Sequence, residues 1–110
     1  MPGTYALKKS TDSQFMFNLK AANGEVILTS QLYTAKASAE DGIASVRKNS
    51  ALDQRYFRRT TKSNEAYFVL KASNKAVIGR SESYSSEAAR DNAVESVKAN
   101  GPTATVKDET

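Results

Sequence analysis

Two stretches of the chain alternate between apolar and polar positions, and they lie 51 residues apart. Every second residue from Phe15 to Leu19 is large and apolar, and every second residue from Ala66 to Leu70 is apolar. A period of two is typical of a strand buried on one face. The first stretch is followed by Ala22-Asn23-Gly24 and then by a β-branched run over residues 26–30. Asn and Gly tolerate positive φ, so the pattern predicts a β-hairpin.

Two registers of this hairpin are compatible with the pattern. A two-residue turn pairs Leu19 with Leu28, whereas a three-residue turn with a bulge at the glycine pairs Leu19 with Ile27. We favour the second register, because Ile27 is repeated as Ile78 in the second stretch while Leu28 is replaced by glycine, a poor core residue.

A helix is predicted after each hairpin, because small apolar residues recur there at helical spacing. The apolar stripes comprise Ala39, Gly42, Ile43 and Val46 in the first helix and Ala93, Val94 and Val97 in the second. Ser38 begins a capping-box pattern, and Glu40-Asp41 would then lie in the first turn, where acids complement the helix dipole. The second helix should start near Ser85 or Ser86. Asn49 and Asn100-Gly101-Pro102 are stop signals.

The two stretches belong to an internal repeat. At an offset of 51 residues, 13 of the 33 positions from 17 to 49 are identical to their counterparts, against about two expected by chance. Shorter strands are predicted at 4–8, 56–60 and 103–107. The chain therefore predicts a single α+β domain over residues 1–110, made of repeats 4–51 and 55–102 and closed by strand 103–107. Two copies sharing one sheet, related by a pseudo-two-fold axis, would bury more surface than one copy alone.

The repeated segments resemble a known family. The run from Phe17 to Ser30, then Leu32-Tyr33 and the segment 42–47, are similar to the YegP-like family of small bacterial tandem-repeat proteins of unknown function, and segments 70–74, 96–101 and 105–108 match as well. The resemblance implies a tandem β3-α-β unit that forms one sheet with exchanged C-terminal strands. It implies no activity. Lys75 departs from the glycine expected at the second hairpin turn.

Composition argues against most enzyme chemistry. The chain has neither histidine nor cysteine, which removes the commonest general base, thiol nucleophiles and thiolate metal sites. Its five glycines form no phosphate-binding loop. We therefore predict no catalytic, cofactor-binding or metal-binding residues. No apolar run approaches the roughly 20 residues that span a bilayer, and we expect a cytoplasmic monomer.

The positive charge is concentrated in the middle of the chain. The net charge is +4, and residues 47–62 hold six basic residues and one acid. Within this segment we single out Arg55, Tyr56, Arg58, Arg59 and Lys62 as candidate partner-binding residues, because interleaved basic and aromatic side chains can bind a nucleic-acid backbone and stack on bases. Strand alternation places Arg55, Phe57 and Arg59 on one face and Tyr56 and Arg58 on the other. The competing interpretation is a strand whose charges prevent aggregation.

A Ser-x-x-Tyr pattern precedes each helix. Ser30 with Tyr33, and Ser81 with Tyr84, would form two hydroxyl-lined sites related by symmetry, or else the tyrosine rings seal the edge of the core. The second interpretation is favoured. We expect a non-catalytic structural or protein-interaction module, and weak sequence-independent nucleic-acid binding through segment 47–62 is the alternative.

Overall fold

The computed structural model describes residues 3–10 and 12–110 of the chain. It contains seven strands, two α-helices and one short 3-10 helix. These are β1 (Thr4–Lys9), β2 (Phe15–Lys20), β3 (Val26–Thr29), α1 (Lys36–Asn49), η1 (Asp53–Arg55), β4 (Tyr56–Thr60), β5 (Ala66–Lys71), β6 (Val77–Arg80), α2 (Glu87–Asn100) and β7 (Thr105–Asp108). The predicted α+β architecture of one sheet with two helices is confirmed.

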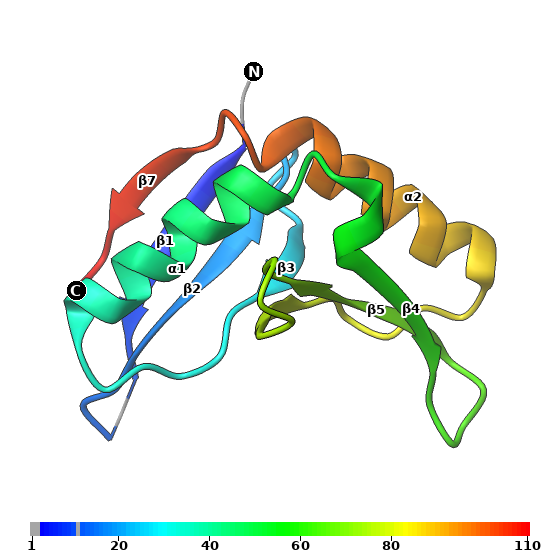
Figure 1. Cartoon of the computed structure of the whole chain (residues 1–110), viewed down its shortest axis with the longest axis horizontal. Coiled ribbons are helices and arrows are strands. Elements are labelled where there is room, and N and C mark those ends of the chain that lie inside the picture. The colour runs from blue at the N-terminus through cyan, green and yellow to red at the C-terminus, as the bar shows by residue number, and fades with distance from the viewer. Residues whose placement is uncertain (1–2, 11) are drawn as a thin grey trace.

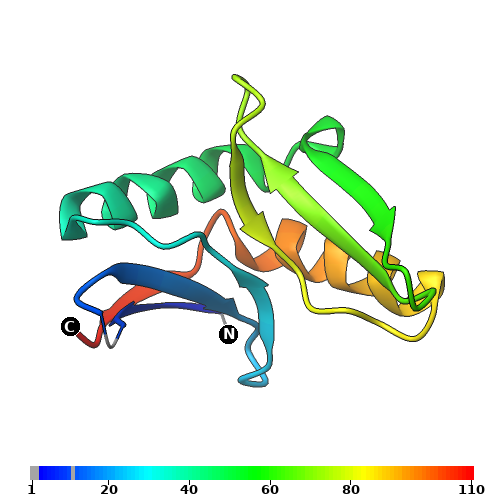
Figure 2. The same ribbon diagram turned by 90° about the horizontal axis from the view of Figure 1, so that it is seen from below.

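All seven strands form one sheet, in the order β4-β5-β6-β3-β2-β1-β7. Both helices pack on the same face of it, and in Figure 2 strands β5 and β6 pass in front of the helices where they overlap. A single apolar cluster fills the space between the helices and the sheet. The opposite face carries no helix of the described part of the chain, and we call it the helix-free face.

The two repeats exchange the strands that follow their helices. Strand β7 follows α2 but pairs in parallel with β1 of the first repeat, and β4 follows α1 but pairs with β5 of the second (Figure 1). Two equivalent buried tyrosines reinforce the exchange, because the Tyr5 hydroxyl donates to the carbonyl oxygen of Gly101 and the Tyr56 hydroxyl to that of Ser50, each over 2.6 Å. Each tyrosine thus binds the end of the other repeat's helix.

A pseudo-two-fold axis passes between β3 and β6. Thr29 and Arg80, which are equivalent residues of the two repeats, are the register pair that joins these strands. Beside the axis, a Cβ atom built on Gly79 would lie 2.6 Å from the Cγ atom of Leu28, its counterpart in the first repeat. Only one of these two positions can hold a large side chain, which explains the replacement of leucine by glycine.

The favoured hairpin register is wrong, although its turn is right. The chain turns over three residues, with Gly24 at φ 87°, and Lys20 pairs with Val26. A further bulge at Ile27 then shifts the register, so Leu19 pairs with Leu28. Glycine at position 79 does not mark a position outside the core. The Leu28 side chain reaches across the axis and fills the space beside Gly79, so position 79 is a core position without a side chain of its own.

The second hairpin adopts the same turn without glycine. Lys75 has φ 70°, which matches the φ of Gly24 at the equivalent position. The first turn of each repeat also shares its geometry, with Ser13 at φ 66° and Asn64 at φ 63°. Positive φ is costly for a residue that carries a Cβ atom, so Lys75 is held in a strained conformation.

This strain predicts opposite effects at the two equivalent positions. We expect Gly24→Val to lower the free energy of unfolding by about 1 kcal/mol or more, and Lys75→Gly to leave it unchanged or raise it by up to about 1 kcal/mol. Among residues 3–10 and 12–110 no atom lies within 4 Å of a Cβ built on Gly24, so the cost there is a backbone cost. Urea denaturation measures both changes, with Lys75→Ala as the control that removes the charge but keeps the Cβ. Losses of equal size for Gly24→Val and Lys75→Gly would contradict the shared turn geometry.

The helix ends are predicted better than the first helix start. Both helices stop at the expected asparagines, and Ser86 caps α2 by accepting a hydrogen bond from the Ala89 amide. Helix α1, however, begins two residues before Ser38, with Ala35 as a cap that makes no side-chain hydrogen bond. The prediction of Ser38 as the cap is therefore wrong, and the first turn of α1 contains no acid. Tyr33 pairs with Phe15 at the start of β2, so only two residues separate the last paired residue from the first residue of α1.

Candidate binding face

A continuous row of paired residues crosses the helix-free face over all seven strands. From one edge to the other the row comprises Phe57, Val69, Arg80, Thr29, Asn18, Ala6 and Lys107. Side chains alternate along each strand, so these residues point away from the core, whereas their chain neighbours such as Phe68 and Leu19 point into it. The row therefore defines the middle of the helix-free face.

The strand positions of this face carry charges of one sign only, and that sign is positive. Six basic residues occupy strand positions on it, and within the described strands no acid does. They are Lys8, Lys20, Arg59, Lys71, Arg80 and Lys107. None of the six forms an ion pair with any residue in 3–10 or 12–110. Glu109, one residue after β7, lines a hollow on this face together with Lys20 and Lys107.

Charges on the helix side are arranged differently, because several of its cations are paired. Lys36 binds Asp108, Lys98 binds Asp53 and Glu95, and Arg58 lies 3.1 Å from a carboxylate oxygen of Asp91. The hydrogen bonds from Lys98 and Arg58 hold the pKa values of the Asp53 and Asp91 carboxyls below their usual range. Arg47, Lys48 and Arg55 on the helix side form no ion pair with the described residues either, but Arg47 and Arg55 donate hydrogen bonds to the Ala104 carbonyl oxygen and the Asn49 side chain. The helix-free face differs because its strand positions hold cations and, among the described strands, no acid.

The structure distributes the five candidate residues of segment 47–62 over different surroundings. Tyr56 is buried in the core, Arg58 pairs with Asp91 on α2, and Arg55 donates from Nε to the Asn49 side chain over 3.0 Å. Arg59 lies on the helix-free face, and Lys62 is exposed in the turn after β4. The predicted alternation of β4 is confirmed from position 56 onwards. Sequence adjacency therefore does not assemble these side chains into one surface.

The two aromatic residues of this segment lie in different environments. The Phe57 side chain lies on the helix-free face and is 38% exposed. Tyr56 is the core residue instead, and burial raises the pKa of its hydroxyl well above the usual value. Of the two rings, therefore, Phe57 is the one that a partner can contact.

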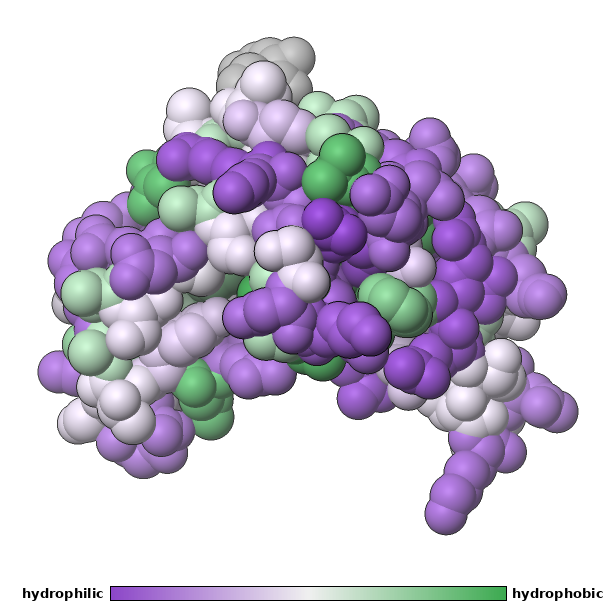
Figure 3. Space-filling model, in the orientation of Figure 1, coloured by the Kyte–Doolittle hydropathy of each residue, from purple (hydrophilic) through white to green (hydrophobic). Residues whose placement is uncertain are grey.

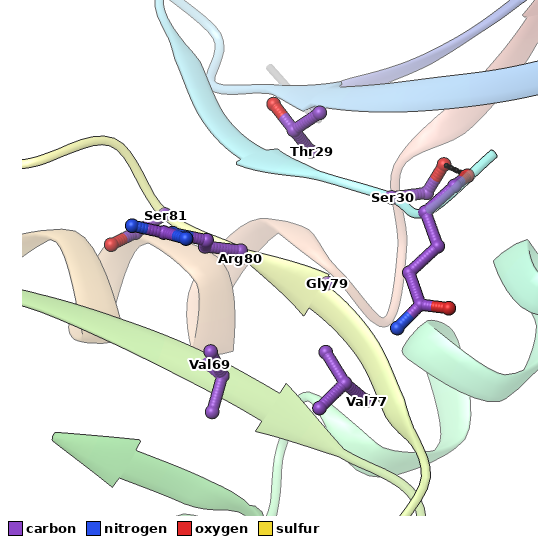
Figure 4. Close-up of a pocket in the computed structure, with 8 residues that line it drawn as sticks. Thr29, Ser30, Val69, Val77, Gly79, Arg80 and Ser81 are labelled. Carbon is purple, nitrogen blue, oxygen red and sulfur yellow. Dashed lines mark hydrogen bonds between the residues drawn. The ribbon is translucent and has the colours of Figure 1, made fainter. Parts of the chain in front are cut away.

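The two serines of the Ser-x-x-Tyr patterns meet at one cavity instead of forming two separate sites. Ser30 and Ser81 both line a cavity of about 390 Å³ at the junction of β3 and β6, on the helix-free face (Figure 4). Each Oγ atom accepts a hydrogen bond from a β-strand amide, Phe17 or Phe68, and donates to the carbonyl oxygen of the next residue. These hydroxyls therefore hold the strand ends in place.

The tyrosines of the same patterns lie away from this cavity. Tyr33 and Tyr84 pack against the core, and burial raises the pKa of both hydroxyls. A Cβ atom on Gly42 would lie 2.7 Å from the Tyr33 hydroxyl, so the glycine of α1 makes room for this ring. Their environment is that of rings that seal the edge of the core.

The cavity at the axis combines apolar walls with a polar rim. Val69 and Val77 form apolar walls, and Thr29, Gln31 and Arg80 contribute polar groups. Figure 3 shows that the surface seen in that orientation is mostly hydrophilic and that its outline is indented along the lower edge. Within residues 3–10 and 12–110, no three acidic side chains gather in a way that could hold a metal ion. No helix of this part of the chain is long and apolar enough to cross a membrane.

The basic residues outside segment 47–62 escaped the sequence analysis. Lys20, Lys71 and Arg80 lie outside the charge cluster, and Lys20 belongs to the other repeat, yet all three lie on the same face of the sheet. The signal that reveals them is their position on the strands, because each stands one residue away from a core position. Assigning every charged residue to a face of its strand would have found the surface.

The fold and sequence both match known proteins. A family model described as "Domain of unknown function (DUF1508)" matches residues 10–56 and again residues 62–108. The UPF0339 protein YegP of Escherichia coli O157:H7 is 56% identical over 110 residues, which is 100% of each chain. A UPF0339 protein of Acinetobacter baylyi is 59% identical over 98% of this chain and 97% of its own.

Two solved structures resemble this one closely. The solution NMR structure of YegP from Escherichia coli superposes with a TM-score of 0.95 at 54% identity, covering 100% of this chain and 95% of that one. The solution NMR structure of a UPF0339 protein from Shewanella oneidensis gives 0.93 at 55% identity, covering 98% and 92%. The two matched segments and the full-length relatives show that the chain belongs to the DUF1508 family of tandem-repeat UPF0339 proteins.

Proposed function

We propose that the protein is a non-catalytic binding module that holds an anionic macromolecule on its helix-free face. The observation that carries this proposal is the set of six cations on the helix-free face, where the described strands place no acid. Cations of the helix side such as Lys36, Arg58 and Lys98 are bound to carboxylates, whereas the six on the helix-free face have no carboxylate partner among the described residues.

Electrostatics and shape both support an extended partner. Several like charges on one face raise the local concentration of a partner of opposite sign and speed its association. The row from Phe57 to Lys107 crosses six inter-strand spacings, about 29 Å at the usual spacing of about 4.8 Å. A long, flexible polyanion can follow such a row, whereas a small anion would contact only part of it.

A protein-interaction module remains compatible with this proposal, provided that the partner is acidic. A protein partner would have to present an acidic surface to the helix-free face. Nucleic-acid binding through segment 47–62 does not fit this face as a whole, because only Arg59 of the five candidate residues lies on it. The relevant surface is built from strands of both repeats.

Two variants with equal net charge test where the partner binds. Lys20→Gln, Lys71→Gln and Arg80→Gln together lower the charge of the helix-free face by three. Lys48→Gln, Lys62→Gln and Lys75→Asn lower the net charge by the same amount at exposed positions away from the strands of that face. Both variants therefore carry a net charge of +1, from +4 less three. Thermal unfolding confirms that both are folded.

We expect the two variants to separate on immobilised heparin in a salt gradient. The variant of the helix-free face should elute at clearly lower salt than the wild-type protein, because its lost charges belong to the binding surface. The control variant should elute close to the wild type. Equal shifts of the two variants would show that only net charge matters, and would overturn the proposal.

A further inference from the structure

We infer that the anionic macromolecule is a single-stranded nucleic acid whose bases contact aromatic rings and the cavity at the pseudo-two-fold axis. The inference rests on the proposed function and specifies its partner. Charge alone would fit any polyanion. The rings and the cavity on the same face add contacts that only a polyanion with planar bases can make.

Two aromatic rings on the helix-free face lie next to cations. The Lys71 ammonium is 4.4 Å from the ring centroid of Phe57, and the Arg80 guanidinium is 4.3 Å from that of Tyr67. Both rings belong to strands β4 and β5, and both face away from the core. A base can stack on the exposed part of such a ring while the adjacent cation contacts the phosphate.

The cavity at the axis has the composition of a site for one planar base. Its volume of about 390 Å³ lies in the lower part of the range of ligand pockets, about 300–1,000 Å³. Val69 and Val77 offer apolar surface for the faces of a ring (Figure 4). Gln31 stands at the rim with both a donor and an acceptor, which suits the hydrogen-bonding edge of a base.

Thr29 provides a further hydrogen-bonding group in this cavity. Its Oγ1 atom accepts a hydrogen bond of 2.9 Å from the Asn18 amide, so its own O–H remains available as a donor. Arg80 lies at the wall of the same cavity and carries an unpaired charge. A nucleotide could therefore rest one face of its base on the two neighbouring valines and place its phosphate at Arg80.

Beyond the cavity, basic residues continue along the face. Lys20 and Lys107 line a second hollow of about 280 Å³ near the opposite edge of the sheet. The backbone of a strand can pass from Arg80 to these lysines across β3, β2 and β1. In a duplex the bases are stacked and paired, so they could not reach the rings or enter the cavity. The geometry thus favours single strands.

The experiment compares strands of equal length that carry bases with one that lacks them. Fluorescence anisotropy is measured with labelled oligothymidylate of about 12 nucleotides, with oligouridylate of the same length and with an abasic strand that keeps every phosphate. Two variants leave the charge unchanged. Phe57→Leu with Tyr67→Leu removes the rings, and Val69→Leu with Val77→Leu narrows the cavity at the axis without adding a ring. Circular dichroism and thermal unfolding establish that each variant is folded.

We expect the wild-type protein to bind one or both of the base-carrying strands about tenfold or more tightly than the abasic strand. Each variant should lose most of this preference, while its affinity for the abasic strand stays unchanged because the cations remain. Four to six phosphate contacts predict that the logarithm of the association constant falls with that of the salt concentration at a slope of about −3 to −4.

The outcomes separate this inference from the proposed function. Equal affinity of the wild-type protein for all three strands would overturn the role of the bases and leave a face that binds polyanions. A base preference that both variants retain would likewise overturn the assignment of the rings and the cavity. Binding to none of the strands, together with no retention on heparin, would overturn the proposed function itself.

Discussion

Replacing Gly79 with leucine should destabilise the protein, and replacing Leu28 with glycine in the same chain should leave a total loss well below the sum of the two single losses. In the Gly79→Leu variant the new side chain would occupy the space that Leu28 already fills, since even a Cβ atom there would lie 2.6 Å from Leu28 Cγ. Overpacking of this kind costs about 1–3 kcal/mol and occasionally more. Leu28→Gly alone should cost about 3–5 kcal/mol, because it empties a fully buried site.

The double variant exchanges the two residues across the pseudo-two-fold axis. Because positions 28 and 79 are equivalent, a leucine at 79 should fill the same central space from the other side. We expect the double variant to lose at most about 2 kcal/mol, so that the two changes are coupled by at least about 2 kcal/mol. Urea denaturation of the four proteins gives the coupling energy. Losses that simply add would contradict the contact across the axis.

A chain cut to residues 1–60 should not fold as a monomer. It retains the first repeat and β4, but β1 loses β7, β3 loses β6 and β4 loses β5. Helix α1 also packs on β5 and β6 as well as on β1 and β2, and the Tyr5 hydroxyl loses the Gly101 carbonyl. The fragment would leave its apolar surface in water, so we expect it to unfold or to dimerise with the two copies completing each other.

Size-exclusion chromatography with light scattering, together with circular dichroism, distinguishes these states. The full chain should be monomeric, because its second repeat supplies every partner that the fragment lacks. The fragment should be either a folded dimer or an unfolded monomer. A folded, cooperatively unfolding monomer of residues 1–60 would show that the repeats are independent, and would contradict the role of strand exchange.

The sequence predicted the repeat, the strands and the apolar helix faces because these features recur within each copy. The pairing of Leu19 escaped prediction because it depends on a contact between the copies. Next to a symmetry axis, equivalent residues meet each other, and Leu28 and Gly79 therefore have to differ in size. The difference between Leu28 and Gly79 therefore reflects their contact across the axis and is no sign that position 28 lies outside the core.

The start of α1 and the binding face were missed for related reasons. A capping pattern at Ser38 is a local signal, whereas the pairing of Tyr33 with Phe15 is a long-range contact that holds the chain in the sheet until just before the helix begins at Lys36. The charge cluster over residues 47–62 is also local. On β4, alternation sends Arg58 to the helix side and Arg59 to the helix-free face. The basic surface becomes visible only when strands from both repeats are placed side by side.

The central claim is that the helix-free face is the binding surface, and an NMR titration of the full-length protein tests it most directly. Oligothymidylate is added to ¹⁵N-labelled protein at low salt, and the amide and side-chain shifts are followed. We predict that the largest changes fall on β5, β6, β3 and β2, including Val69, Arg80 and Thr29, while the outer faces of α1 and α2 change little. Changes concentrated on the helices or on segment 47–55, or no change at any concentration, would contradict it.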